Sequence, residues 1–293
     1  MDRLPAELID AILQESSITD VCNLAATNRR WHQQCLHRIY YFPKLNNAKQ
    51  HDLFFKSTNY HTQMYIRHLN LEPSLITNEQ LERLTGCTGL ISLQLSHCAH
   101  ISSDVLDKVL RSCVASVQRV YLADGKLAQS TLQLLGQASR YFHLRTLDLS
   151  NTMIRPCDRI DTPHHLESMI MNINEDANND FTTANSGDDK NNTLHDLNLS
   201  YCSWVDDTTL LNVTFGLPFL KFINLRFCHH LSAMAIMKMI RHLRYISTID
   251  VCHVPCMNEP SCVHNLLSLN PLLEKINFTH HFKPSLLIRS PQI

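Results

Sequence analysis

The stretch Leu194–Leu210, LHDLNLSYCSWVDDTTL, decides the fold. Its apolar anchors are separated by two, one and two residues, and they are Leu194, Leu197, Leu199 and Cys202. A β-strand sends successive side chains to opposite faces, so Leu197 and Leu199 point into a core and Asn198 points away from it. Val205 and Leu210 extend the pattern beyond the strand. This arrangement indicates a short strand followed by a further apolar segment.

Seven more segments of the chain carry the same central pair of aliphatic residues. The first member of each of the eight pairs is Leu69, Leu93, Val120, Leu147, Leu197, Ile223, Ile249 and Ile276. The steps between them are 24, 27, 27, 50, 26, 26 and 27 residues. Repeats of this length are typical of leucine-rich repeats, in which each unit supplies one strand and one helix. The sequence therefore predicts an α/β solenoid of about eight repeats over residues 66–282.

The 50-residue step points to an insertion. Leu166, Met169, Ile170 and Ile173 fit the helix that this repeat requires. The surplus, residues 174–192, is acidic and polar with almost no apolar side chains, so burial cannot offset the entropy lost on ordering. We expect a disordered insertion at this place. Whether it binds a partner is left open.

The N-terminal segment predicts three short helices. Pro5 suits the first turn of a helix, and an apolar stripe follows at helical spacing, formed by Leu8, Ile9, Ile12 and Leu13. Thr19 is the expected N-cap of a second helix, and a third is expected to start near Asn28. A bundle of this size has little core of its own. Residues 43–65, with Leu53, Phe54 and Phe55 as their apolar centre, are expected to form a connecting helix that caps the solenoid.

LPAELIDAIL, the Thr-Asp-Val start of the second helix and ATNRRWHQQC together resemble an F-box, with the match running from residue 3 to about residue 40. Ser16 and Ser17 stand where many F-boxes carry an aromatic residue or leucine. The repeats that begin at Leu90, Leu194 and Leu220 resemble the cysteine-containing subclass of leucine-rich repeats, which is typical of F-box proteins. The resemblance implies binding to a Skp-family adaptor within a cullin-based ubiquitin ligase. It places the adaptor-facing positions at Leu4, Pro5, Leu8, Ile12, Leu24 and Trp31.

Composition argues against nucleic acid or a membrane as a partner and against secretion. A net charge of −1 over 293 residues gives no electrostatic case for nucleic acid or an anionic membrane. No apolar run approaches the roughly 20 residues that span a bilayer, and the start does not read as a signal peptide. Eleven scattered cysteines do not form a disulfide framework. We therefore expect reduced thiols and a cytoplasmic or nuclear location.

The sequence offers no catalytic constellation, so we expect a non-enzymatic protein without a cofactor. It has no Gly-rich phosphate loop, no GxSxG and no HExxH. The segment 252–264 holds Cys252, Cys256 and Cys262 with two histidines, but their spacing does not match two pairs of zinc ligands. Cys98, Cys202 and Cys228 occupy the cysteine position of their repeats, where a small buried thiol packs and bonds weakly to backbone. We expect no metal site.

The concave face of the sheet is the expected target-binding surface. Residues between the paired core positions point out of this face, and at about 4.8 Å per strand eight strands make a stripe of roughly 35–40 Å. The stripe is polar, with Tyr121 and Phe222 as its expected aromatic anchors. The candidate target-binding residues are Gln94, Arg119, Tyr121, Asp148, Asn198, Phe222, Asn224, Arg226, Asp250 and Asn277.

Together these features predict an F-box at residues 1–42, a solenoid, and a C-terminal tail at residues 283–293 that is either exposed or a partial ninth repeat. The function that the resemblance implies is that of a substrate receptor in a Skp–cullin–F-box ubiquitin ligase. The alternative is an interaction scaffold without an adaptor, in which the N-terminal bundle only caps the repeats. The protein target cannot be read from the sequence.

Overall fold

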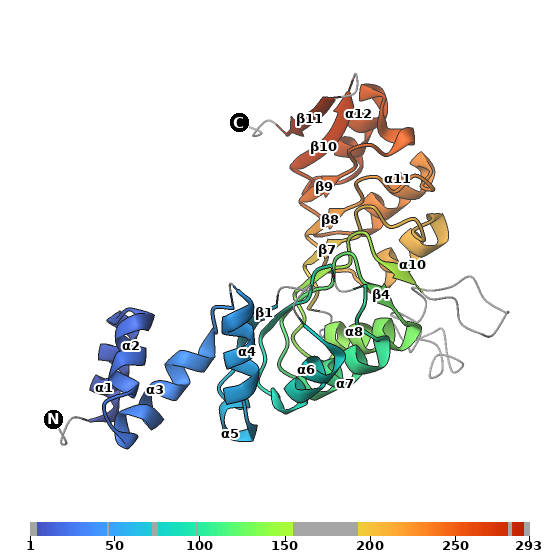
Figure 1. Ribbon diagram of the computed structural model, residues 1–293. Coiled ribbons are helices and arrows are strands. Elements are labelled where there is room, and N and C mark those ends of the chain that lie inside the picture. Colours follow the sequence, from blue (N-terminus) through green and yellow to red (C-terminus); the bar gives the residue numbers. More distant parts are fainter. Residues whose placement is uncertain are drawn as a thin grey trace, which may run out of the picture.

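The computed structural model describes residues 5–45, 47–71, 76–97, 99–154, 193–280 and 283–289. It shows an N-terminal group of helices followed by a curved stack of strands, with helices along the outer side of the curve (Figure 1). The predicted insertion at residues 174–192 and the helix predicted around Leu166–Ile173 lie outside the described residues, as does Cys98.

One sheet of nine strands runs the length of the solenoid. Its strands, in spatial order, are β1 (His68–Asn70), β2 (Ser92–Gln94), β3 (Arg119–Tyr121), β5 (Thr146–Asp148), β7 (Asp196–Asn198), β8 (Phe222–Asn224), β9 (Thr248–Asp250), β10 (Lys275–His280) and β11 (Lys283–Ile288). All neighbours pair in parallel except β10 and β11, which are antiparallel. The strand order confirms the predicted repeat architecture.

The register of the sheet follows the core positions predicted from the sequence. Leu69 lies opposite Leu93, and Leu93 lies opposite Val120. Leu147 lies opposite Leu197 although fifty residues separate them in the sequence. All eight central residues are buried. The extra residues of this repeat therefore leave the strand register unchanged.

Helices cover one face of the sheet, because within the described residues the chain returns from one parallel strand to the next through helical segments. They are α6 (Asn78–Glu82), which continues into a 3₁₀ turn (Arg83–Gly86), α7 (Ser103–Cys113), α8 (Gln129–Tyr141), α10 (Asp207–Gly216), α11 (Ala233–His242), a 3₁₀ turn (Pro255–Met257) and α12 (Pro260–Leu269). A second, two-stranded sheet pairs β4 (Lys126–Leu127) with β6 (Met153–Ile154). Leucines and isoleucines from strands and helices form one continuous core from Tyr40 to Phe278.

The N-terminal bundle consists of α1 (Ala6–Glu15), α2 (Ile18–Ala25) and α3 (Arg29–Tyr41). Its own core is small, with Ile9, Leu13, Val21, Ala25 and Cys35 buried together. The C-terminal end of α3 also reaches the main core, because Tyr40 is buried there and Ile39 packs against both cores. One continuous helix therefore joins the bundle to the solenoid (Figure 1).

Two features of the connecting segments differ from the sequence prediction. The connection forms two helices, α4 (Ala48–Ser57) and α5 (Tyr60–Gln63), because Asn59 caps a new helix with its side chain. Phe54 and Phe55 are buried as expected, but Leu53 is exposed, since helical spacing turns it away from its two neighbours. Of the segment 283–293, predicted as an exposed tail or a ninth repeat, residues 283–288 instead form the antiparallel strand β11.

Candidate functional site

The apolar stripe of α1 has two faces. Ile9 and Leu13 are buried in the bundle, whereas Leu8 is 52% exposed and Ile12 is 47% exposed. Pro5, just ahead of the helix, is exposed as well. The sequence predicted one stripe, but residues at successive positions lie about 100° apart around a helix, so only one pair can reach the core. The helix thus leaves two aliphatic side chains, one turn apart, in contact with solvent.

The other predicted adaptor-facing residues are distributed unevenly. Leu24 and Trp31 are half-buried and pack against the bundle core, which leaves part of each side chain accessible. Leu4 lies outside the described residues. The structure therefore brings Leu8 and Ile12 together on one face of α1, and their role in adaptor binding stays a prediction.

The caps of α2 and α3 explain the serines and the asparagine of this region. Thr19 is not the N-cap of α2, as the sequence suggested; the Oγ of Ser17 accepts a hydrogen bond from the backbone N–H of Asp20 at 3.2 Å. Ser16 ends α1 by donating its hydroxyl to the carbonyl oxygen of Ile12 at 2.7 Å. The predicted start of the third helix is confirmed, because Asn28 accepts from the N–H of Trp31 at 3.0 Å.

Four of the candidate target-binding residues are already used within the sheet. Asp148, Asn198, Asn224 and Asp250 each accept a hydrogen bond from the backbone N–H two residues later, at 2.9 to 3.1 Å. This repeated bond closes the turn that follows each strand. The sequence alone left open whether these side chains bind a target or are only solvated. The structure gives them a third role, the closing of a turn, which follows from their position at the end of a strand.

The remaining candidates on this face differ in exposure. Arg119 is exposed, whereas Gln94, Tyr121 and Phe222 are half-buried. Asn277 is half-buried and donates its side-chain amide to a carboxylate oxygen of Asp250 at 3.1 Å. Arg226 lies after β8, beyond the end of the stripe. Their contact with a target stays a prediction.

A second row of residues follows the carboxyl ends of the strands. Its six members have positive φ angles between 51° and 61°, and they are His97, Asp124, Asn151, Tyr201, Phe227 and His253. The backbone N–H of each of the first five bonds to a carbonyl oxygen of the next repeat, at 2.7 to 3.0 Å, and that of His253 bonds to the hydroxyl of Thr279 at 2.8 Å. We call this row the rim ladder. This row could not be predicted from the sequence, because large side chains give no signal for a left-handed backbone.

Three members of the rim ladder form a column of stacked rings. The ring centroids of Tyr201 and Phe227 are 4.4 Å apart with an interplanar angle of 18°, and those of Phe227 and His253 are 4.3 Å apart at 17°. Tyr201 is 48% exposed. The guanidinium carbon of Arg226 lies 5.4 Å from the centre of the Phe227 ring. Stacked aromatic residues beside a cation make a surface with both apolar and electrostatic recognition.

The repeat cysteines are structural, as predicted. The thiol of Cys202 donates to the carbonyl oxygen of Leu149 at 3.0 Å, and that of Cys228 donates to Leu199 at 3.2 Å. Burial raises the pKa of Cys228 to about 12 and that of Cys202 to about 11. A thiol with so high a pKa is neutral near pH 7 and a poor nucleophile.

The segment 252–264 does not gather its thiols and imidazoles around one point. Cys252 is buried in the turn after β9, and Cys256 and Cys262 pack against the main core. Throughout the described part of the chain, no three His, Cys, Asp or Glu side chains lie close enough together to hold a metal ion. Nor does any described helix have the length and apolar character needed to span a bilayer.

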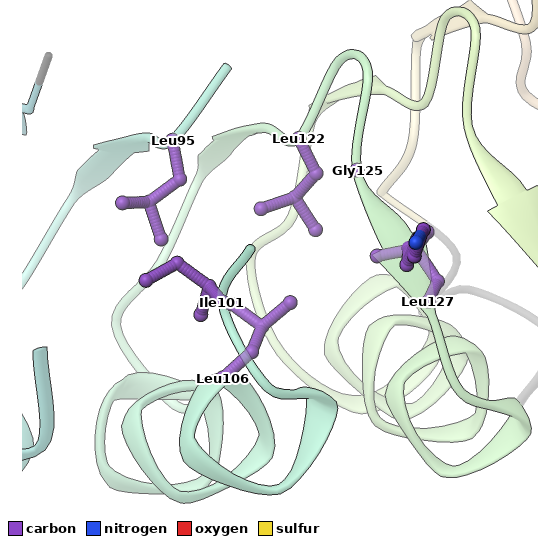
Figure 2. Close-up of a pocket in the computed structure, with 7 residues that line it drawn as sticks. Leu95, Ile101, Leu106, Leu122, Gly125 and Leu127 are labelled. Atoms are coloured by element: carbon purple, nitrogen blue, oxygen red, sulfur yellow. The ribbon is translucent and has the colours of Figure 1, made fainter. Parts of the chain in front are cut away.

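A small, mostly apolar cavity lies between the second and third repeats. Figure 2 shows Leu95, Ile101 and Leu106 lining it together with Leu122 and Gly125. Its volume is about 10 Å³, at the lower limit of the space that one water molecule needs. Gly125 stands where Cys202 and Cys228 stand in their repeats, so the cavity lies where a side chain is missing. This space is too small for a substrate or cofactor.

Residues 1–44 match a family model described as F-box-like. The N-terminus of this chain is an F-box-like domain. It precedes a leucine-rich-repeat solenoid, and this combination supports a role in protein interaction. The match covers α1 to α3, so the exposed residues Leu8 and Ile12 belong to the F-box-like domain.

Two solved structures align with this chain at low sequence identity. The leucine-rich repeat-containing protein LegL7 from Legionella pneumophila is 13% identical over 82% of this chain and 72% of its own, with a TM-score of 0.43. A chain from the Rad7 and Elc1 complex of yeast is 14% identical over 89% of this chain and 92% of its own, with a TM-score of 0.29. Both TM-scores are below 0.5, so the fold rests on the strand register described above.

Proposed function

We propose that this protein is the substrate-recognition subunit of a Skp–cullin–F-box ubiquitin ligase, working in the cytoplasm or nucleus. The observation that carries the proposal is the exposed pair Leu8 and Ile12 on α1 of the F-box-like domain. Aliphatic side chains this exposed gain by burial against a partner, at about 1 kcal/mol for each half-buried side chain. A Skp-family adaptor is the partner that the F-box-like domain implies.

In this role the protein carries out no bond chemistry. The bundle binds the adaptor and, through it, the cullin, while the solenoid holds a target protein. Because α3 runs without a break from the small core into the main core, the two binding regions are fixed relative to one another at that point. Holding a target close to a charged ubiquitin-conjugating enzyme raises the rate of transfer by proximity.

The test is co-expression of the full chain with a Skp-family adaptor, followed by size-exclusion chromatography. We expect the wild type to elute as a complex and the double variant Leu8→Asp, Ile12→Asp to elute alone. Leu53→Asp on α4 is the matched control, since Leu53 is equally exposed but lies outside the F-box-like domain, and it should still form the complex.

Failure of the wild type to bind, with the circular dichroism of a folded chain, would overturn the receptor proposal. The alternative function would then be an adaptor-free interaction scaffold with the bundle as its cap. The packing of Tyr40 and Ile39 into the solenoid core is the observation that favours this alternative.

A further inference from the structure

The rim ladder divides into two halves of different chemistry. In the first half the side chains are polar and satisfy one another: His97 pairs with Asp124, and the amide of Asn151 donates to Asp124. In the second half Tyr201, Phe227 and His253 stack as rings. The surface open to a ligand therefore lies over β7 to β9.

The left-handed backbone conformation of the ladder does not require aromatic side chains. A left-handed conformation is tolerated by Asn, Asp and Gly, and it is strained for bulky residues. The chain itself uses Asp124 and Asn151 at the equivalent places of earlier repeats. Residues held in strained conformations concentrate at functional sites. Tyr201 thus keeps a large exposed ring, and Phe227 a half-buried one, where a smaller residue suits the backbone better.

Arg226 is the one positively charged residue in the row next to the ladder. Six of the seven equivalent residues are small, and they are Ser96, Ala123, Ser150, Ser200, Cys252 and Thr279; the seventh, in the first repeat, is Glu72. The Nε of Arg226 is buried and has no hydrogen-bond partner within the described residues. Over the same residues, the ion pairs within 4.0 Å do not include Arg226. Arg226 as a whole is half-buried, and a charged group that is partly buried without a partner costs free energy. An anionic ligand that pairs with the accessible part of the guanidinium would reduce this cost.

We propose that Arg226 and the Tyr201–Phe227–His253 column form a docking site for an acidic segment of a protein partner. A carboxylate of the segment accepts hydrogen bonds from the guanidinium, and a flat side chain next to it packs against Tyr201, the exposed ring of the column. Such charge-assisted bonds to a planar guanidinium are strong and directional. The inference rests on the proposed function only in taking this partner to be the ligase target.

The charge of the site favours a carboxylate over a phosphate. Phosphate recognition generally uses a cluster of arginines, whereas Arg226 is a single cation here. Asp250 lies on the neighbouring strand β9, where its backbone carbonyl oxygen accepts the N–H of Leu225 at 2.8 Å. Its carboxylate opposes a doubly charged ligand more strongly than a singly charged one.

The experiment measures binding of short blocked peptides to the full chain by fluorescence polarisation. The probes share one sequence with a central tyrosine and differ only in the neighbouring residues, which are glutamate, glutamine, lysine or phosphoserine. The variants are Arg226→Ser and the pair Tyr201→Asn, Phe227→Asn, which install residues that the chain uses at equivalent positions. Arg111→Ser, at an exposed arginine in the last turn of α7 and outside the candidate target-binding set, is the control.

We expect the glutamate peptide to bind the wild type and the Arg111→Ser control equally, and to bind each site variant at least about tenfold more weakly. The melting temperature of Arg226→Ser should not fall, because the change removes an unpaired donor. A structural role for Arg226 predicts the opposite, a loss of stability.

Three results would overturn the proposal: equal affinity for the glutamate and glutamine peptides, tighter binding of the phosphoserine peptide, or unchanged binding in the site variants. The same variants are also tested for co-elution with the adaptor. This second measurement distinguishes a failure of the docking site from a failure of the proposed function. Loss of peptide binding with the adaptor retained supports the site, whereas an adaptor that fails to bind the wild type counts against the ligase role alone.

Discussion

The thiol of Cys228 donates a hydrogen bond to the backbone carbonyl oxygen of Leu199, 3.2 Å away in the preceding repeat. Cys202 makes the same bond to Leu149 across the step that contains the extra residues. In these two repeats the cysteine therefore links the unit to the one before. A small thiol suits this place because it fills the turn and still supplies a weak donor.

Replacing Cys228 with alanine should lower the free energy of unfolding by about 1–2 kcal/mol, because it removes the thiol bond and leaves an unfilled space in the core. Urea denaturation followed by circular dichroism measures the change. Cys22, an exposed cysteine of α2, is the control, and its replacement by alanine should change the stability by less than about 0.5 kcal/mol. Equal effects at both positions would contradict the structural role.

Stability should fall at alkaline pH. Burial raises the pKa of Cys228 from its usual 9.0 to about 12, and it raises the pKa of Cys87 and Cys113 to about 12 as well. The unfolded chain releases these protons near pH 9, whereas the folded chain retains them to about pH 12. The free energy of unfolding should therefore decrease as the pH rises through this window, and Cys228→Ala should show a shallower decrease in the same titration.

The two faces of α1 should separate stability from binding. Ile9→Ala should cost about 2–4 kcal/mol of bundle stability, because Ile9 is buried in a core of five residues. Leu8→Ala should change the stability by less than about 0.5 kcal/mol and weaken adaptor binding. Hydrogen exchange of the α1 and α2 amides measures the change in bundle stability, and co-elution with the adaptor measures the change in binding. A stable Ile9→Ala bundle would contradict the assignment of faces.

The cap of α2 offers a matched pair of substitutions two residues apart. Ser17→Ala should destabilise the helix by about 1 kcal/mol, since it removes the acceptor for the N–H of Asp20. Thr19→Ala should have a much smaller effect, because Thr19 lies exposed within the helix. Hydrogen exchange at the first turn of α2 measures both. A larger effect of Thr19→Ala than of Ser17→Ala would support Thr19 as the N-cap, as the sequence suggested.

The last residues of the solenoid should contribute to stability through Arg289. Its guanidinium donates to the carbonyl oxygens of Leu273 at 3.0 Å and Asn270 at 2.7 Å, and also to that of Leu267. These acceptors lie near the C-terminal end of α12, where carbonyl groups lack partners within the helix. Arg289→Ala should lower the free energy of unfolding by about 2 kcal/mol, measured by urea denaturation. Lys283→Ala, exposed on β11, is the control.

Much of the solenoid could be predicted because its signal is local and repeated. Each strand places Leu93 and its counterparts in the core, so the spacing of leucines along the chain is also the register of the sheet. The ending was harder to predict. β11 pairs antiparallel with β10, and such a pairing depends on a turn and on contacts that a repeat pattern does not contain.

The sequence by itself determined the architecture: the repeat period, the buried thiols and the F-box-like start, because hydrophobic periodicity and short motifs are written in neighbouring residues. Only the tertiary structure decided which half of the α1 stripe faces the core and which Asn and Asp side chains close turns. It alone brought Tyr201, Phe227 and His253, each about one repeat from the next, into one column of rings. Those outcomes depend on which surfaces meet after folding, and contacts between distant residues leave no local pattern in the chain.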